Sequence, residues 1–160
     1  MAAAFKPLMP LDEAWSRLQA AVVEHLGQTP RSTDVVESFD ALGRVLAEDL
    51  VSALHVPPQD NSSMDGYAVR VADVREKGSV MPISQRVAAG HAAQPLQPGT
   101  CARIFTGAPV PPGADAIVMQ EDTREVGGDF HAVHIDAVPG PGQWIRCAGE
   151  DVTRGAVVLP

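Results

Sequence analysis

A polar loop in the first half of the chain constrains the fold more than any other stretch. The segment 56–70, VPPQDNSSMDGYAVR, begins with a Pro57-Pro58 pair that lacks backbone donors and fixes an extended entry. Short polar side chains then follow closely, namely Asp60, Asn61, Ser62, Ser63 and Asp65. Such a run is incompatible with a buried strand or a helix interior. Gly66 ends the run by permitting a backbone conformation closed to other residues, and Tyr67 to Val69 predict the start of a strand.

This polar loop has two interpretations. Two carboxylates, two hydroxyls and an amide on a stiffened loop favour contact with a phosphate, a metal or another polar ligand. The alternative is an Asx-rich turn whose side chains only bond their own backbone. The local sequence leaves both interpretations open.

Composition limits the class of protein and its partners. At 160 residues, with 45% hydrophobic and 20% charged residues, the chain suits one ordinary globular domain or two small ones. Aromatic residues make up only 4%, so an aliphatic core is expected, and 14 glycines with 14 prolines indicate many turns. A formal net charge of -8 argues against a general nucleic-acid or anionic-membrane surface. We therefore expect no nucleic-acid partner and no membrane partner.

The cysteines and the N-terminus indicate the compartment. Cys101 and Cys147 are too few for a disulfide scaffold and lack the spacing of a zinc site, so we expect both to be reduced. Residues 1–9 lack the pattern of a signal peptide, and no run approaches the roughly 20 apolar residues of a membrane span. These features predict a soluble, cytoplasmic protein.

Periodicity predicts a helix near the N-terminus. Apolar residues recur at three- and four-residue steps, which indicates a helix at about 11–26. Its Trp15 is expected to pack either in the chain's own core or against another subunit. Residues 40–43 predict a single helical turn, and residues 44–52 predict a strand covered on both faces.

From Tyr67 onward the pattern is one of short strands and turns. Strands are predicted at 80–89, 100–105, 116–120, 130–135, 143–147 and 156–159. No helical pattern between them is long enough for parallel crossovers, so we expect an antiparallel, twisted sheet or a small barrel. The predicted fold class is α+β, mainly β.

Two further places carry residues suited to an anion. Thr106 and Gly107 stand at the tip of an apolar strand, where a hydroxyl and backbone N–H groups can meet a ligand. The alternative for Thr106 is local bonding within a turn. Arg146 is a candidate anion ligand, and its alternative is a solvated ion pair with the neighbouring Glu150 and Asp151.

Three spaced motifs together carry a family resemblance: PPQDNSSMDGYAVR, RIFTGAPVPPGADAIVMQED and WIRCAGEDVTRGAVVLP. From about Pro10 to Pro160 the chain resembles the N-terminal part of the MoeA/gephyrin-type molybdopterin molybdenumtransferases. The resemblance implies insertion of molybdate into adenylylated molybdopterin with release of AMP, assisted by Mg²⁺ or another divalent metal. Molybdate and adenylylated molybdopterin are then the substrates.

The resemblance also implies roles for single residues. The aspartate of the MDGYA motif and the threonine of the TGAP motif matter for activity in that family, and they are Asp65 and Thr106 in this sequence. We expect both to be catalytic and Asp65 to hold the metal. Residues expected to contact the bound substrate are Ser63, which replaces a frequent alanine, Gly66, Gly107 and Arg146.

The family architecture implies how the chain is divided. Residues 1–56 and 144–160 resemble an elongated part that forms a homodimer, and residues 57–143 resemble a β domain inserted in it. The family continues beyond the equivalent of Pro160 into an α/β domain with most of the pterin and nucleotide pocket, and then into a small β domain. The chain is therefore expected to be a fragment, inactive alone, whose Asp65 and Thr106 supply one wall of the cleft.

The partners implied besides a second copy are the molybdopterin adenylyltransferase and acceptor molybdoenzymes. Some family members also act as scaffolds for other proteins. The alternative function is therefore a noncatalytic dimerisation or scaffolding module that binds a protein partner. An exposed apolar groove for a peptide would distinguish the two functions.

Overall fold

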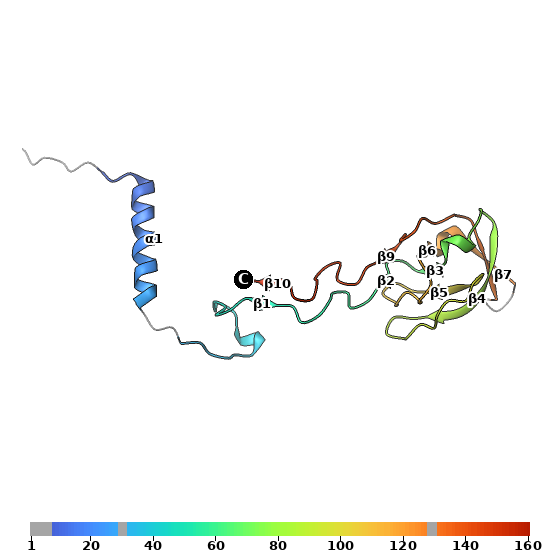
Figure 1. Ribbon diagram of the computed structural model, residues 1–160, viewed down its shortest axis with the longest axis horizontal. Helices are drawn as coiled ribbons and strands as arrows, with labels where there is room; N and C mark the ends of the chain where they lie inside the picture. Colours follow the sequence, from blue (N-terminus) through green and yellow to red (C-terminus); the bar gives the residue numbers. More distant parts are fainter. Residues whose placement is uncertain (1–7, 29–31, 128–130) are drawn as a thin grey trace, which may run out of the picture. The chain divides into compact units, whose positions relative to one another are not determined.

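The computed structural model describes residues 8–28, 32–127 and 131–160 (Figure 1). The chain divides into two units, Met1–Ala47 and Glu48–Pro160. Helices carry the secondary structure of the first unit, and the described strands belong to the second. Within the described ranges, no helix is long and apolar enough to cross a membrane.

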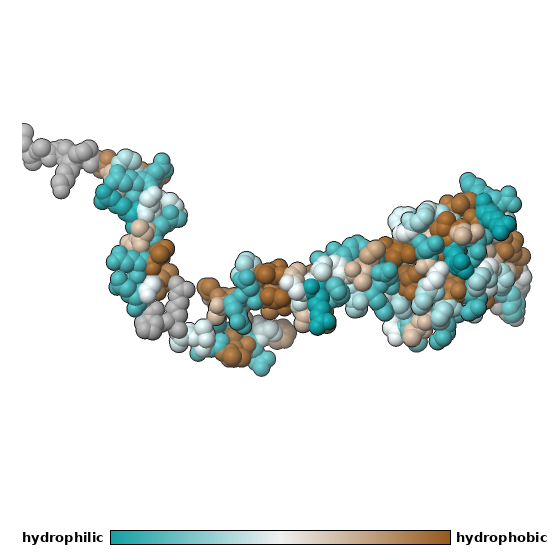
Figure 2. All heavy atoms as spheres, in the orientation of Figure 1, coloured by the Kyte–Doolittle hydropathy of each residue, from teal (hydrophilic) through white to brown (hydrophobic). Residues whose placement is uncertain are grey.

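The first unit contains the predicted helix. An α-helix, α1 (Leu11–Gln28), confirms the one expected at about 11–26. Asp12 and Glu13 lie in its first turn, where carboxylates interact favourably with the helix dipole. The helix buries no residue, and Trp15 is 58% exposed. Hydrophobic atoms are visible on the surface of α1 in Figure 2.

The segment after α1 differs from the prediction. A 3-10 helix, η1 (Ser38–Asp40), lies about two residues before the helical turn expected at 40–43. Only β1 (Leu50–Val51) forms a strand within 44–52, and it pairs antiparallel with β10 (Val157–Leu159). Both residues of β1 are 51% exposed. The expected strand covered on both faces is therefore wrong, because an apolar pattern does not reveal whether its covering surface lies in the same chain.

The second unit is built on a six-stranded sheet in the order β6-β3-β5-β4-β8-β7. Its strands are β3 (Gly66–Val69), β4 (Ser79–Val87), β5 (Cys101–Ile104), β6 (Ala116–Met119), β7 (Thr123–Val126) and β8 (Ala132–Ile135). Two 3-10 helices lie between strands, η2 (Val71–Asp73) and η3 (Gln120–Asp122).

The sheet is antiparallel as predicted, except for one pair. β4 and β5 are parallel, and the remaining neighbours are antiparallel. The expectation of a wholly antiparallel sheet failed because a helix was assumed to be necessary for a parallel crossover. Here the segment 88–100 makes that connection without a helix, since it is long enough to return the chain along the sheet.

Sequence patterns located most of these strands but missed β7 (Thr123–Val126). Three of its four residues are exposed, so it lacks the apolar alternation from which a strand is recognised. The strand expected at 130–135 is observed as β8, from residue 132, and residue 130 lies outside the described residues.

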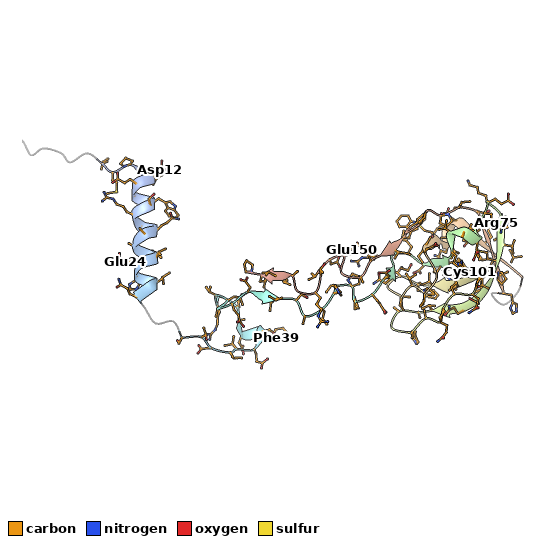
Figure 3. The ribbon with its side chains drawn as sticks, in the orientation of Figure 1. Asp12, Glu24, Phe39, Arg75, Cys101 and Glu150 are labelled. Carbon is orange, nitrogen blue, oxygen red and sulfur yellow. The ribbon has the colours of Figure 1, made fainter. Side chains whose placement is uncertain are left out.

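The core lies on the two faces of this sheet. Alternate residues of β3 enter different clusters, with Tyr67 and Val69 in one and Ala68 in the other. A hydrogen bond of 3.2 Å from Tyr67 on β3 to Glu125 on β7, the last strand of the order, shows that the sheet curls. Cys101 lies within the core (Figure 3), and its burial raises the pKa of the thiol to about 12.

Two short ladders connect the ends of the second unit. β2 (Asn61–Ser62) pairs antiparallel with β9 (Ile145–Arg146), and β1 pairs with β10. A single bridge joins Val56 to Val152 between these ladders. The strand segment that enters the polar loop is thereby held beside the segment that leaves the β sheet (Figure 1).

Both cysteines, Cys101 and Cys147, are free thiols, as predicted.

Candidate functional site

The two polar loops identified in the sequence are hydrogen-bonded to each other. The backbone of Ser62 donates to Ala108 O at 3.0 Å and accepts from Gly107 N at 2.8 Å. Farther along, Val110 N donates to Asp60 O at 3.0 Å. The polar loop and the segment after β5 therefore form one structure, although they are distant in the sequence.

Asp65 and Thr106 meet where these loops join. Asp65 Oδ1 accepts a hydrogen bond from Thr106 N at 2.8 Å and another from Thr106 Oγ1 at 2.7 Å. Asp65 is half-buried, whereas Thr106 is exposed. The structure thus brings together the two residues expected to be catalytic. The Asp65 carboxylate bonds outside its own loop, so the turn-only interpretation is wrong for this residue.

The two bonds from Thr106 favour the ionised form of Asp65. The backbone bond lowers the pKa of the carboxyl most, and the hydroxyl bond lowers it further. Partial burial opposes this effect, and the positive charge of Arg103 adds to it. The pKa of Asp65 consequently lies below its ordinary value, and the group is negatively charged at neutral pH.

Both hydrogen bonds end on the same oxygen of the carboxylate. In the part of the chain that the structure describes, Oδ2 of Asp65 accepts no hydrogen bond and joins no ion pair. An ionised carboxylate has lone pairs for several partners. Asp65 is therefore oriented through one oxygen and open to a ligand through the other.

Ser62 fits the other interpretation of the polar loop, in which a side chain bonds only the backbone of its own turn. Its hydroxyl donates to Met64 O at 2.5 Å and accepts from Met64 N at 3.3 Å. Ser62 is buried, and these local bonds satisfy its side chain within the turn. The loop thus combines a serine that shapes the turn with an aspartate directed at another segment.

The two glycines of the site are required for different reasons. A Cβ on Gly66 would clash with the carbonyl oxygen of Val118 on β6, so glycine is needed for the close approach of two strands. Gly66 does not have the left-handed backbone that we expected, and that reason was wrong. Gly107 does have it, with φ of 77°. A contact of either glycine with a ligand remains a prediction.

Ser63 and Arg146 lie near the ladder between β2 and β9. Ser63 donates its backbone N–H and its hydroxyl to Trp144 O, at 2.9 and 2.8 Å. The guanidinium of Arg146 lies 2.5 Å from Asp151 Oδ2 and 3.7 Å from Glu150 Oε1. These carboxylates raise the pKa of Arg146, with Asp151 the larger cause. The ion-pair alternative is thus what the structure shows for Arg146, and its contact with an anionic substrate remains a prediction.

Sequence reasoning missed Arg103, which contacts both halves of the site. Its Nη1 donates to Gly66 O at 2.9 Å, and its Nη2 donates to Gln120 Oε1 at 2.7 Å. Its guanidinium also lies over the ring of Phe105, 4.6 Å from the centroid. The available signal was a cation inside the otherwise apolar strand Cys101–Ile104.

An open groove of about 550 Å³ borders the site at Gly107. Both polar loops line it, together with the segment 90–93. Asn61 lies in its wall, and among the described residues Asn61 Oδ1 is a buried acceptor without a hydrogen-bond partner. The groove provides space for a ligand that would reach the site at Gly107, the residue after Thr106.

The donor set fits only one kind of metal site. Among residues 8–28, 32–127 and 131–160, no cluster of three or more His, Cys, Asp or Glu side chains is placed to hold a metal. Mg²⁺ in enzymes that act on phosphates is usually held by one or two carboxylates, water and the substrate itself. The open oxygen of Asp65 fits this arrangement. A closed site made only of protein ligands is not present in the described residues.

Comparison with known proteins identifies similar sequences. Residues 9–160 match the family model described as MoeA N-terminal region (domain I and II). The chain is 43% identical over 135 residues to the molybdopterin molybdenumtransferase of Nostoc sp., covering 81% of this chain and 30% of that protein. It is 38% identical over 153 residues to the molybdopterin molybdenumtransferase of Haemophilus influenzae, and this match covers 95% of this chain and 36% of that protein.

A solved structure shares the fold of the chain. The molybdopterin biosynthesis moeA protein from Pyrococcus horikoshii OT3 superimposes with a TM-score of 0.73 at 35% sequence identity. The match covers 80% of this chain and 34% of that protein. The chain thus spans about a third of the length of the relatives that it matches.

Proposed function

The chain belongs to the family of MoeA N-terminal regions, and on this premise we propose that it is the N-terminal part of a molybdopterin molybdenumtransferase. The reaction that we assign to the whole protein is insertion of molybdate into adenylylated molybdopterin, with release of AMP. Support comes from the Nostoc and Haemophilus influenzae relatives, which are named molybdopterin molybdenumtransferases.

The Asp65–Thr106 pair carries this proposal. Thr106 donates hydrogen bonds from both its N–H and its hydroxyl to Asp65 Oδ1. Its principal role is therefore to orient the carboxylate. Asp65 is then an ionised group with a fixed direction and an open Oδ2, and the groove begins at Gly107, the residue after its partner Thr106. A negative group of this kind shares a site with phosphate only if a cation lies between them.

We assign that cation to Mg²⁺ or another divalent metal, held by Asp65. A bound Mg²⁺ neutralises charge on phosphate oxygens and polarises them. The protein's own contribution is to keep Asp65 ionised and directed, and to leave the groove open beside it. In the proposed site Ser63, Gly66, Gly107 and Arg146 border the substrate.

The site as proposed is one wall of a cleft. We assign the opposite wall, with most of the pterin and nucleotide contacts, to parts of the whole protein outside these 160 residues. Residues 57–143 form the inserted β domain in this proposal, and residues 1–56 with 144–160 form the elongated part. The antiparallel pairing of β1 with β10, and of Val56 with Val152, supports the grouping of residues 50–56 with the segment 152–159.

A homodimer is proposed from the apolar residues of the first unit. Leu11, Trp15 and Leu18 of α1 are 82%, 58% and 56% exposed. Phe39 of η1 (Figure 3) is 99% exposed. Exposed apolar surface of this extent typically marks an interface. The same observation supports the second candidate, a scaffolding module that binds another protein. A cytoplasmic location and contacts with molybdopterin adenylyltransferase or acceptor molybdoenzymes remain predictions.

A chimera tests the proposed activity. The 160 residues are joined to the remaining C-terminal part of the Haemophilus influenzae relative, and release of AMP from adenylylated molybdopterin is followed with and without molybdate. We expect molybdate-dependent release from the chimera. The 160-residue chain alone should be inactive, because one wall of a cleft does not orient both reactants. A folded chimera without activity would contradict the proposed function.

A further inference from the structure

Arg103 donates hydrogen bonds to the backbone of Gly66 and to the side chain of Gln120, and both of these residues adjoin Asp65. Nη1 of Arg103 donates to the carbonyl of Gly66, the residue after Asp65, at 2.9 Å. Nη2 donates to Gln120 Oε1 at 2.7 Å, and Gln120 N donates in turn to Asp65 O at 3.0 Å. One guanidinium therefore holds the carbonyl of Gly66 directly and that of Asp65 through Gln120.

The same guanidinium also contacts the residues before Thr106. Its carbon lies 4.6 Å from the ring centroid of Phe105, the residue that precedes Thr106. Nη1 is 3.4 Å from Ile104 O. The guanidinium carbon also lies 5.2 Å from the ring centroid of Tyr67. A planar guanidinium can donate in its plane and stack through its face at the same time.

We infer that Arg103 is a positioning residue, which sets the separation between the Asp65 loop and the Thr106 turn so that Thr106 bonds Asp65 Oδ1. The inference rests on the proposed function of the Asp65–Thr106 pair. The pair needs such support because Thr106 is exposed, and water competes for hydrogen bonds at an exposed position. Apart from the two bonds of Thr106, the positive charge of Arg103 also favours the ionised carboxylate.

Arg86 provides a matched control on the neighbouring strand. It is the register partner of Arg103, and its guanidinium lies over the same ring of Phe105 at 4.7 Å. Arg86 is exposed, and among the described residues its guanidinium donates no hydrogen bond to the Asp65 loop. Arg86 thus shares the charge and the aromatic contact with Arg103 but lacks the bonds to Gly66 and Gln120.

Amide hydrogen exchange of the 160-residue chain, measured by NMR without substrate or metal, tests the inference. In Arg103→Met we expect the Thr106 amide to exchange about tenfold faster or more, because its bond to the Asp65 carboxylate is weakened. The core amide of Ile117, bonded to Gln143 O, should keep its rate. In Arg86→Met both amides should exchange as in the wild type.

Arg103→Lys keeps the charge and protects the test against a folding failure of Arg103→Met. An ammonium group cannot bond Gly66 O and Gln120 Oε1 and stack on Phe105 in the same geometry, so faster exchange at Thr106 is again expected. Unchanged exchange at Thr106 in both Arg103 variants would overturn the inference. So would an equal acceleration at Thr106 and Ile117, which indicates a merely structural role. An inactive chimera would refute the proposed function without affecting this result.

Discussion

Thr106 donates both its backbone N–H and its hydroxyl to a single oxygen of Asp65, although 41 positions separate the two residues in the sequence. This arrangement determines what a substitution at either residue removes. Changing Asp65 alters the charge and the open oxygen, whereas changing Thr106 alters the direction and the acidity of the carboxylate. The two residues can therefore be tested separately.

Asp65→Asn in the chimera is expected to reduce AMP release by about 100-fold or more with little change in melting temperature, because the negative charge that holds the divalent metal is lost. Asn still presents one oxygen to Thr106 but places an NH₂ group where Oδ2 stood. Turnover should be measured over a range of Mg²⁺ concentrations. The matched control is Asp60→Asn in the same loop, whose carboxylate accepts from Ala148 N at 2.8 Å. Wild-type activity and metal dependence in Asp65→Asn would refute the role of Asp65.

Thr106→Val is expected to raise the pKa of Asp65, which can be followed by NMR titration of the carboxyl carbon. The backbone bond, which lowers the pKa most, remains in this variant, so the pKa should stay below the ordinary 3.8. A pKa depressed in the folded state stabilises the fold above the unfolded value, and this stabilisation is lost as the pH falls through the folded pKa. The part of the stability difference between wild type and variant that depends on pH should therefore disappear below the folded pKa of wild-type Asp65. An unchanged pKa would show that the hydroxyl bond is not formed in solution.

The 160-residue chain is expected to be a dimer through α1, with an interface of about 1,000 Å² or more. Light scattering at tens of micromolar should report twice the mass of one chain. Trp15→Glu should give a monomer, because it places a charge within the apolar stripe. Arg17→Ala is the control, since Arg17 is exposed and pairs with Glu13 on the helix surface. A wild-type chain that is monomeric under these conditions would argue against the dimer.

Gly66→Ala should destabilise the chain by about 3 kcal/mol, because the added Cβ meets the backbone of Val118 where β3 pairs with β6. Gly99→Ala separates this effect from backbone strain. Gly99 has φ of 72° and open space around it, so a loss of about 1 to 2 kcal/mol is expected. Urea unfolding measures the loss of stability in each variant. Equal losses would show that space at Gly66 is not the limiting factor.

Local patterns predicted the elements of this chain unequally. The helix at 11–28 follows from its own periodicity, because residues three and four apart lie on one face. The strand at 44–52 was overestimated because apolar residues alone do not show what covers them. β7 was missed because its exposed residues carry no alternation. A parallel pairing between β4 and β5 has no local signature, since register and direction depend on residues far apart.

For the site, the sequence by itself determined the candidates: Asp65, Thr106 and the two polar loops that hold them. Their residue types and spacing are written in consecutive positions, and the family resemblance depends on the same motifs. The tertiary structure decided that the two loops pair, that both donors of Thr106 converge on Oδ1, and that Arg103 contacts the neighbours of each residue. These contacts join residues on β3, β5 and the turns beyond them. They exist only once the register of the curled sheet is set, which no short stretch of sequence encodes.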